Sequence, residues 1–371
     1  MKIALLLESD GPGGAETVLL TMAKSLRERG HQIVPVGPKE GEGWLGERFR
    51  EAGFEPAFFE LRRALDIRCV MDLKALMQRR GVDVMHSHEF TMAVYGAAAA
   101  RLAGVPHVIT MHGGRYYAGA LRRRVAFRWA IRNSARTVAV SGFTARDLET
   151  SLGLAEGSLH VIPNGLRITR GDRANVREEL GLSATDLLVL TVGNLYLVKG
   201  QDVLVRAVAR VLKEDPSLPV YLAVAGRGEQ EPVLRSLARE NGIIDRVHFL
   251  GFRDDVPDLL AAADVFALPS RSEGLPLALL EAMFAGRPVI ASAVGGIPEV
   301  VRHNQEALLC EPDSPDDLAS ALSSLLREPD LRERLGTAGR DLAKQRYSPE
   351  AMVSAYETVY RSGLKRTSQS T

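Results

Sequence analysis

Apolar runs of strand length alternate with longer helical patterns along almost the whole chain. In the first half, the runs that predict strands are Ile3–Leu7, Ile33–Val36, Val82–His86, His107–Met111, Thr137–Val140 and His160–Ile162. In the second half they are Leu187–Val192, Val220–Ala225, Val247–Leu250, Val265–Leu268, Pro288–Ala291 and Ala307–Cys310. Helical patterns such as Ala15–Arg29 and Thr91–Ala103 fall between the strands. This alternation indicates an α/β chain with parallel sheets and crossover helices.

The length of the chain predicts two domains, since 371 residues exceed what one small core accommodates. A polar stretch at Arg167–Glu179 has no strong apolar period, and we interpret it as the linker. Residues 1–166 and 167–347 would each form a Rossmann-like, doubly wound domain. The last helix, within residues 348–362, is expected to pack back on the first domain. Two such domains would face a central cleft, and ligands bind at the carboxyl ends of strands in these folds.

Composition narrows the classes of partner. The chain is 46% hydrophobic and 25% charged, as in ordinary globular proteins, and its net charge of +1 argues against nucleic-acid binding. Cys69 and Cys310 have neither metal nor redox spacing, which fits a reducing cytosol. No apolar run approaches the ~20 residues that span a bilayer. We therefore expect a cytoplasmic protein, or one at the inner face of the plasma membrane.

Two carboxylates, Glu273 and Glu281, stand with seven residues between them, and the second lies in an apolar run. Pro276 suits a first helical turn and Gly286 suits a helix end. Glu281 is therefore expected inside a helix, and Glu273 in the loop before it. A buried carboxylate needs partners, which sugar hydroxyls could supply. A structural carboxylate paired with an arginine is an equally open interpretation at this point.

A glycine-rich turn follows the first strand of each predicted domain. The first contains Gly13 and Gly14, and the second contains Asn194 and Lys199. Such turns expose backbone N–H groups to a phosphate, and Lys199 could neutralise a phosphate near a helix N-terminus. Arg227 brings another cation to the end of the next strand. Neither turn has the dinucleotide or P-loop spacing, so plain tight turns and solvated cations remain as alternatives.

Histidines lie near two predicted strand ends. His112 follows a strand and precedes two glycines, so we expect its side chain at the ligand-binding edge. His86 and His88 share one strand face by period two and could hold a metal, but no third ligand is apparent. The chain has no Asp-x-Asp pair of the kind that holds a nucleotide-bound cation. We predict no metal site.

A basic tract occupies residues 90–146, which contain nine arginines and no acidic residue. Arg124, Arg128 and Arg132 recur every four residues, so they would line one helical face beside Val125 and Trp129. A basic amphipathic helix can lie on anionic lipid or hold a phosphorylated acceptor. A solvated basic face is the alternative.

Several motifs together resemble those of a known family. They are the amino-terminal Gly-Gly-Ala-Glu turn, Ile162-Pro-Asn-Gly165, Gly193 with Lys199-Gly200, Glu273-x₇-Glu281, and Ala285-Gly-Arg-Pro-Val-Ile-Ala-Ser followed by Gly295-Gly-Ile-Pro-Glu299. Their order along nearly the whole chain resembles that of the retaining glycosyltransferases of family 4, which have the GT-B fold. The resemblance implies a hexosyltransferase that uses a UDP- or GDP-sugar donor and needs neither a metal nor another cofactor.

The resemblance also implies roles for single residues. Glu281 would bond the ribose hydroxyls, and the groups that would face the donor sugar are Glu273 and the backbone of Gly274, Leu275 and Pro276. The residues assigned to the diphosphate are Gly13, Gly14, Asn194, Lys199 and Arg227. His112 and Glu273 would lie at the reaction centre, where the acceptor attacks from the face that the leaving phosphate vacates. The family usually has arginine where Asn194 stands, and Arg227 or Arg253 could compensate for the missing cation.

The leading prediction is a retaining glycosyltransferase of cell-surface polysaccharide or glycolipid biosynthesis. Its acceptor would be lipid-linked or an oligosaccharide, and the residues expected to meet the acceptor or an anionic membrane are Arg115, Arg124, Arg128 and Arg132. One alternative is a GT-B sugar-nucleotide epimerase, which turns over without an acceptor. Another alternative is a non-catalytic binding subunit with the same fold. Asn194, which stands where the family usually has arginine, is the feature that favours this alternative. The spacing of the glycine-rich turns disfavours an NAD-dependent oxidoreductase.

Overall fold

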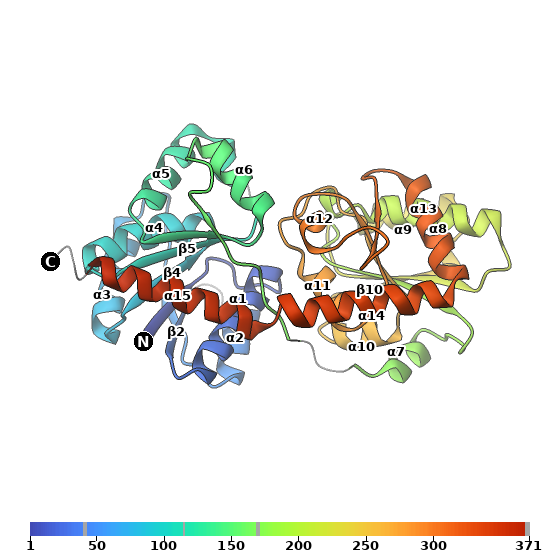
Figure 1. Cartoon of the computed structure of the whole chain (residues 1–371), viewed down its shortest axis with the longest axis horizontal. Helices are drawn as coiled ribbons and strands as arrows, with labels where there is room; N and C mark the ends of the chain where they lie inside the picture. Colours follow the sequence, from blue (N-terminus) through green and yellow to red (C-terminus); the bar gives the residue numbers. More distant parts are fainter. Residues whose placement is uncertain (40–42, 114–115, 168–170, 368–371) are drawn as a thin grey trace. The chain divides into compact units, whose positions relative to one another are not determined.

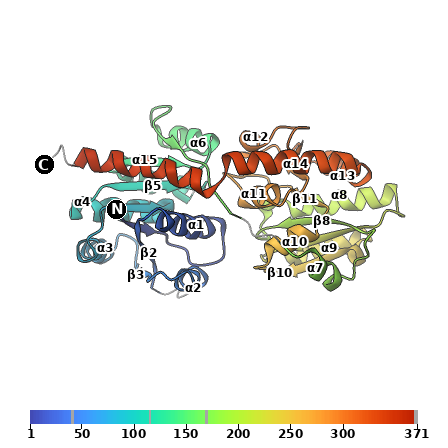
Figure 2. The ribbon, with the colours of Figure 1, turned by 60° about the horizontal axis from the view of Figure 1, so that its bottom comes forward.

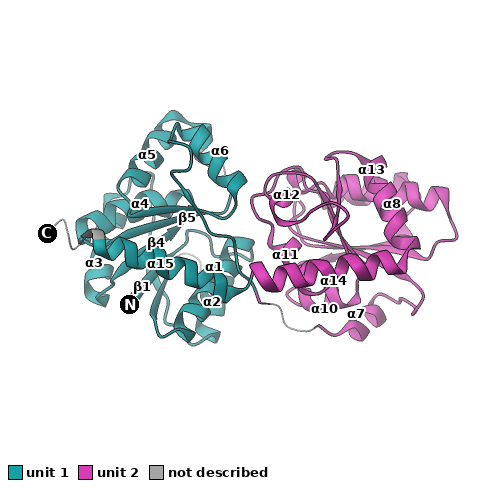
Figure 3. Ribbon diagram, in the orientation of Figure 1, with its two compact units in different colours: residues 1–166, 348–371 teal, residues 167–347 magenta. Residues whose placement is uncertain are grey.

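The computed structural model describes residues 1–39, 43–113, 116–167 and 171–367. The chain divides into two compact units, which are coloured separately in Figure 3. Unit 1 comprises Met1–Leu166 and Ser348–Thr371, and unit 2 comprises Arg167–Tyr347. Each unit holds one sheet flanked by helices, and all the paired strands in both sheets are parallel (Figure 1). The predicted α/β architecture with parallel sheets is confirmed.

Unit 1 is built on a seven-stranded sheet in the order β3-β2-β1-β4-β5-β6-β7. Its strands are β1 (Lys2–Leu6), β2 (Gln32–Pro38), β3 (Ala57–Phe59), β4 (Val84–His88), β5 (His107–Met111), β6 (Arg136–Ala139) and β7 (His160–Val161). Its helices are α1 (Gly14–Glu28), α2 (Trp44–Glu51), α3 (Ile67–Arg80), α4 (Glu89–Ala103), α5 (Leu121–Arg132), α6 (Gly142–Leu152) and α15 (Pro349–Thr367), with a 3₁₀ turn η1 (Tyr116–Gly119). The strand order reverses between β1 and β4, and doubly wound sheets bind ligands outside the carboxyl ends of the strands at such a reversal.

Unit 2 repeats this plan with a six-stranded sheet in the order β10-β9-β8-β11-β12-β13. Its strands are β8 (Leu187–Val192), β9 (Val220–Ala225), β10 (Val247–Gly251), β11 (Val265–Leu268), β12 (Val289–Ser292) and β13 (Leu308–Cys310). Its helices are α7 (Arg173–Glu179), α8 (Gln201–Glu214), α9 (Glu231–Glu240), α10 (Val256–Ala262), α11 (Leu277–Phe284), α12 (Ile297–Val300), α13 (Pro315–Arg327) and α14 (Pro329–Arg346), with 3₁₀ turns η2 (Leu197–Lys199) and η3 (Ile244–Arg246). Here the reversal lies between β8 and β11.

The core of unit 2 shows why its strands read as continuous apolar runs. Leu204 and Val208 of α8 pack with Leu322 and Leu325 of α13 against strand residues that include Val189. On the other face of the sheet, α10 packs against β8. A strand covered on both faces buries consecutive side chains, so its sequence loses the alternation of a half-exposed strand.

The carboxyl-terminal helix α15 belongs to unit 1, where it lies beside α1 and over β5 (Figure 2). Its Glu357 accepts hydrogen bonds from Arg29 and His31, each at 2.8 Å. These hydrogen bonds hold the pKa of Glu357 at about 2. The hydroxyl of Tyr360 lies 2.7 Å from Nδ1 of His86, in the buried interior of unit 1. The helix thereby supports β4, which leads directly into α4.

The predicted linker at Arg167–Glu179 is wrong over its second half. Residues Arg173–Glu179 form α7, which packs on α10 within unit 2. Asp172 caps this helix by accepting a backbone N–H, and the buried Arg177 donates to Asp264 and to three backbone carbonyls. Polar contacts hold α7, which is why its sequence shows no strong apolar period. Residues 168–170 of the predicted linker lie outside the described ranges.

Candidate functional site

Loops at the carboxyl ends of three neighbouring strands carry most of the residues assigned to the donor in unit 2. Asn194 and Lys199 follow β8, Arg227 follows β9, and Glu273 follows β11. The strand order reverses between β8 and β11. These loops therefore surround the place at which doubly wound sheets bind ligands.

Lys199 and Glu273 form an ion pair at this edge of the sheet. The ammonium of Lys199 lies 2.8 Å from Oε1 of Glu273, and Ser270 Oγ donates to the same oxygen at 2.6 Å. The side chain of Glu273 is 8% exposed and that of Lys199 is 29% exposed. A buried carboxylate is stable only with such partners. The contacts fix a cation directly before the N-terminus of α8 while leaving part of it open to a ligand.

Two glycines allow the backbone to pack tightly around Glu273. A Cβ atom on Gly200 would lie 2.0 Å from the carbonyl oxygen of Pro269, and one on Gly295 would lie 1.8 Å from that of Glu273. Both glycines also have positive φ, 66° and 58°. Any side chain at either position would push a neighbouring loop away from Glu273, which accounts for these two glycine motifs in physical terms.

Glu281 lies inside α11, and Glu273 lies in the loop before it, as predicted. Pro276 is the N-cap residue of α11 and not part of its first turn. Among the described residues, the carboxyl group of Glu281 has no hydrogen-bond or ion-pair partner, so the structural arginine considered above is not found. Burial raises the pKa of Glu281 to about 7. A carboxyl group in this state is available to ligand hydroxyls.

The two arginines near this edge of the sheet, Arg227 and Arg253, differ in the contacts that their side chains already make. The guanidinium of Arg227 lies 5.2 Å from the centre of the Phe252 ring and the residue is exposed. Arg253 instead donates to Asp255 and to Glu179 at 2.5–3.0 Å. Since it would have to leave two carboxylates, Arg253 is a poor substitute for the cation missing at Asn194. Lys199 and Arg227 remain as candidates for a diphosphate.

The glycine-rich turn of unit 1 has an acidic neighbour. Gly13 is the N-cap residue of α1, which begins at Gly14. A Cβ atom on Gly13 would lie 2.5 Å from Oε2 of the buried Glu16. A carboxylate at a helix N-terminus competes with a bound phosphate for the same N–H groups. This turn is therefore a weaker candidate for the diphosphate than the loop that carries Lys199.

His112 follows β5, and its side chain and backbone are both held by residues at the end of β4. Its Nε2 lies 2.9 Å from Nδ1 of His88, and its backbone N–H donates to Oε1 of Glu89 at 3.0 Å. Glu89 has φ of 63°, a left-handed conformation that is unusual outside glycine. Burial lowers the pKa of His112 to about 4 and raises that of Glu89 to about 7. His112 is therefore neutral at pH 7.

His86 is part of the interior. Its Nδ1 contacts the hydroxyl of Tyr360 at 2.7 Å, and its Nε2 contacts Oγ1 of Thr110 at 2.8 Å. Both ring nitrogens are thus engaged by neutral hydroxyl groups. Over the ranges that the structure describes, no group of three or more His, Cys, Asp or Glu side chains is arranged to hold a metal ion.

The predicted basic helix is α5, and two of its arginines lie against the end of a neighbouring helix, α6. Arg124 donates to the carbonyl oxygen of Ser151 at 2.6 Å, and Nη1 of Arg128 would lie 3.2 Å from a Cβ atom on Gly153. Both cations thus lie at the carboxyl end of α6, where positive charge is stabilising. Arg124 is nevertheless exposed, and the expectation that it meets lipid stays a prediction. Arg115, the other residue predicted to meet the acceptor, lies outside the described residues.

An apolar ridge on α5 is exposed as well. Leu121, Val125 and Trp129 are 75%, 59% and 40% exposed, and their spacing of four places them on one helical face. Arg132 at the end of the helix is also exposed. None of the helices, over the residues described, is long and apolar enough to cross a membrane.

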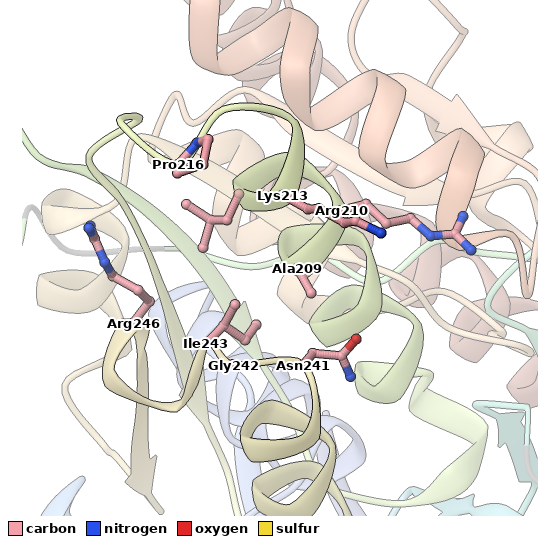
Figure 4. Close-up of a pocket in the computed structure, with 9 residues that line it drawn as sticks. Ala209, Arg210, Lys213, Pro216, Asn241, Gly242, Ile243 and Arg246 are labelled. Atoms are coloured by element: carbon pink, nitrogen blue, oxygen red, sulfur yellow. The ribbon is translucent and has the colours of Figure 1, made fainter.

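A second candidate site in unit 2 is a cavity of about 530 Å³ between α8, α9 and η3. It lies beside the segments that precede β9 and β10, and so away from the carboxyl ends of the strands. Two of its lining residues, Arg210 and Arg246, point away from each other (Figure 4). Arg210 pairs with Asp316, and Arg246 stacks over the ring of Tyr221. These cations do not converge on a common ligand.

Comparisons with known proteins agree with this geometry. The family model "Glycosyltransferase Family 4" matches residues 12–170, and "Glycosyl transferases group 1" matches residues 172–342. The D-inositol 3-phosphate glycosyltransferase of Actinosynnema mirum is 34% identical over 301 residues, which are 74% of this chain and 72% of that protein. The chain belongs to glycosyltransferase family 4.

Two further relatives support the fold and the enzyme class of this family 4 glycosyltransferase. The N-acetyl-alpha-D-glucosaminyl L-malate synthase of Bacillus anthracis is 26% identical over 372 residues, 95% of each chain. The structure of Anabaena HepE in complex with UDP-glucose is similar with a TM-score of 0.84 and 25% identity, over 97% of this chain and 99% of that chain. The fold is GT-B, as predicted.

Sequence reasoning missed several residues that hold the site. Ser270 opens the Glu273 loop but was not assigned a contact. Arg271 donates to Asp202 at 2.9 and 3.0 Å, and so ties this loop to α8. His88 was considered only as a metal ligand. The Ser-Arg-Ser-Glu spacing could have suggested Ser270, whereas the contacts of Arg271 and His88 are with residues far away in the sequence and leave no local signal.

Proposed function

We propose that this enzyme transfers a hexose from a UDP- or GDP-sugar to a lipid-linked or oligosaccharide acceptor, with retention of the anomeric configuration. The observation that carries the proposal is the Lys199–Glu273 ion pair at the β8/β11 reversal, followed in the chain by Glu281, whose carboxyl group has no partner among the residues that the structure describes. HepE, which was solved with UDP-glucose, supports a nucleotide-sugar donor.

For each part of a nucleotide sugar (the ribose, the diphosphate and the transferred sugar) we propose contacting residues in unit 2. Glu281 would accept hydrogen bonds from the ribose hydroxyls, because its carboxyl group has no partner among the described residues. The ammonium of Lys199, directly before the N-terminus of α8, would hold the diphosphate together with exposed Arg227 and the backbone at Asn194. Glu273 and the backbone from Gly274 to Pro276 would contact the transferred sugar.

The reaction we propose needs no nucleophile from the protein. The bond between the anomeric carbon and the diphosphate oxygen breaks, the acceptor oxygen bonds to that carbon on the same face, and the acceptor proton passes to the leaving phosphate. Negative charge therefore grows on the diphosphate, where the fixed cation Lys199 stabilises it. With a pKa of about 4, His112 is a weak proton acceptor at pH 7, so we assign it to binding the sugar.

We further propose that α5 rests on the anionic inner face of the membrane that presents a lipid-linked acceptor. The exposed ridge of Leu121, Val125 and Trp129 supplies apolar area, and exposed Arg132 supplies positive charge beside it. This combination is typical of helices that lie in the headgroup region of anionic bilayers. A lipid-linked acceptor places the enzyme in cell-surface glycolipid or polysaccharide biosynthesis.

Incubation with nucleotide sugars tests the proposed activity. We expect nucleoside diphosphate release that depends on an added lipid-linked or oligosaccharide acceptor, and a product whose anomeric proton shows the donor's configuration by NMR. Rapid turnover of the donor without acceptor would instead identify an epimerase. Donor binding without turnover under any acceptor would identify a binding subunit.

A further inference from the structure

His88 and His112 share a single hydrogen bond inside unit 1. Nδ1 of His88 and Nε2 of His112 lie 2.9 Å apart, and the two rings are inclined by only 15°. The remaining nitrogens, Nε2 of His88 and Nδ1 of His112, are buried and have no hydrogen-bond partner among the described residues. Burial also lowers the pKa of both rings, so both are neutral at pH 7. Each ring then carries one proton, and the question is where each proton lies.

Only two arrangements satisfy the shared hydrogen bond. If His88 donates from Nδ1 to Nε2 of His112, then Nε2 of His88 is unprotonated, and the proton of His112 must lie on its Nδ1. If His112 donates from Nε2 to Nδ1 of His88, then Nδ1 of His112 is unprotonated, and the proton of His88 must lie on its Nε2. Each arrangement leaves one N–H and one lone pair without a partner.

The burial of the two residues distinguishes the arrangements. His88 is 0% exposed, whereas His112 is only partly buried and ends its strand beside Gly113. Orphaned N–H groups are rarer in protein interiors than under-satisfied acceptors, because they are costly. The unpartnered N–H is therefore better placed on His112, the less buried of the two residues, than on His88.

We propose that His88 is a positioning residue that holds His112 in the tautomer with its proton on Nδ1. The orientation of His88 is itself supported: its ring lies 4.3 Å from that of His86, which Tyr360 and Thr110 hold from both sides. The helix α15 thus fixes His112 through a chain of rings. This inference rests on the proposed function only in its consequence, which is that His112 offers an N–H donor to a hydroxyl of the transferred sugar.

The unpartnered Nδ1–H gives this tautomer a role in binding. No acceptor within the described parts of the chain contacts this nitrogen, and an N–H group left unpaired there costs free energy. A sugar hydroxyl that accepts from it would remove this cost on binding. In the opposite tautomer the same position would present a lone pair, and the hydroxyl would have to donate. His88 therefore decides which hydroxyl geometry His112 selects.

Ring-nitrogen NMR of the ligand-free, full-length protein labelled with ¹⁵N-histidine tests the tautomer directly. The chain has eight histidines, and the His112 signals are assigned by their loss in His112→Asn. We expect Nδ1 of His112 to be protonated and its Nε2 to be unprotonated. A proton on Nε2 of His112 would overturn the proposal. Because no substrate is present, this result stands even if the protein proves to transfer no sugar.

Two variants at one position extend the test. In His88→Leu we expect His112 to move its proton to Nε2 and kcat to fall about 10²-fold, as for loss of one oriented donor, with KM for the acceptor little changed. In His88→Asn, whose amide can donate from nearly the same place as Nδ1, the Nδ1–H tautomer and most of kcat should return. His107→Asn is the matched control, since His107 is equally buried but bonds to Ser87 and Ser134. An equal loss of kcat in this control, or unchanged kcat in His88→Leu, would contradict the positioning role.

Discussion

Replacing Glu281 by glutamine should stabilise the fold and weaken the donor site at the same time. Burial raises the pKa of Glu281 from 4.5 to about 7. Because a carboxyl group whose folded pKa is raised favours the protonated form, it costs stability as pH rises through the interval from 4.5 to 7. A neutral amide of the same size does not carry this cost. The variant should therefore exceed the wild type in stability at high pH.

The size of the gain follows from the pKa. At roughly 1.4 kcal/mol per pKa unit, the raised value corresponds to about 3 kcal/mol at pH 8 but only about 1 kcal/mol at pH 5. For a domain of this size, roughly 2–4 °C in melting temperature accompanies each kcal/mol. The variant should thus melt roughly 6–12 °C above wild type at pH 8, and only a few degrees above it at pH 5.

Calorimetry of both proteins at the two pH values measures this effect on the transition of unit 2. Glu333→Gln is the matched control, because Glu333 is an exposed carboxylate in the same unit and surface substitutions usually change stability by less than about 0.5 kcal/mol. Titration of the donor should show affinity lower by roughly 10- to 100-fold in Glu281→Gln, since hydrogen bonds to a charged group are lost. A melting-temperature difference that does not grow with pH would refute the assignment of Glu281 as a desolvated carboxyl group that lacks a partner in the described ranges.

Three further predictions concern other parts of the molecule. Lys199→Ala should lower kcat by about 10²–10³-fold in the sugar-transfer assay, because a preorganised cation at the leaving diphosphate is lost; wild-type turnover would remove Lys199 from the site. Glu357→Gln should lower the melting temperature of unit 1 at neutral pH, and the difference should disappear as pH falls from 4.5 towards 2, since the stabilisation from a pKa of about 2 is lost over that interval; a constant difference would contradict it. Replacing Val125 and Trp129 together by serine should abolish flotation with anionic vesicles while leaving neutral-vesicle controls unchanged, and retained flotation would exclude the ridge as a membrane contact.

The strands of both sheets could be predicted because most of them are buried on both faces. Four predicted strands match the structure residue for residue, and the other predicted strands overlap their observed counterparts. The four are His107–Met111, Leu187–Val192, Val220–Ala225 and Val265–Leu268. The strand β3 (Ala57–Phe59) was not predicted, although the equally short β13 and the shorter β7, which are also edge strands, were. Apolar runs therefore indicated the central strands and two of the short edge strands.

Polar contacts were the main obstacle to prediction. The helix α7 lacks a strong apolar period because Arg177 holds it through hydrogen bonds, and a polar helix cannot be told from a linker by pattern alone. The hydrogen bond from Arg124 to the carbonyl of Ser151 was not predicted either, because the fold alone brings the two residues together. In both cases the acceptor of an arginine cannot be read from the local pattern.

The candidate site was predictable in its residues but not in its contacts. The sequence placed Glu273 in a loop and Glu281 in a helix, and the structure has them there. It could not show that Glu273 is paired with Lys199, while Glu281 has no partner among the described residues. The two carboxylates look equivalent in the sequence, and only their surroundings separate their chemistry.

Binding of nucleotide sugars to unit 2 residues tests the central proposal most directly. A panel of UDP-, GDP- and ADP-sugars should be titrated against the wild type, Glu281→Ala, Lys199→Ala and the control Glu333→Gln, with affinity read from calorimetry or from thermal stabilisation. We predict that one nucleotide sugar binds the wild type and the control equally, and binds both site variants at least about 10-fold more weakly. Unchanged affinity in Glu281→Ala and Lys199→Ala would contradict the proposed donor site.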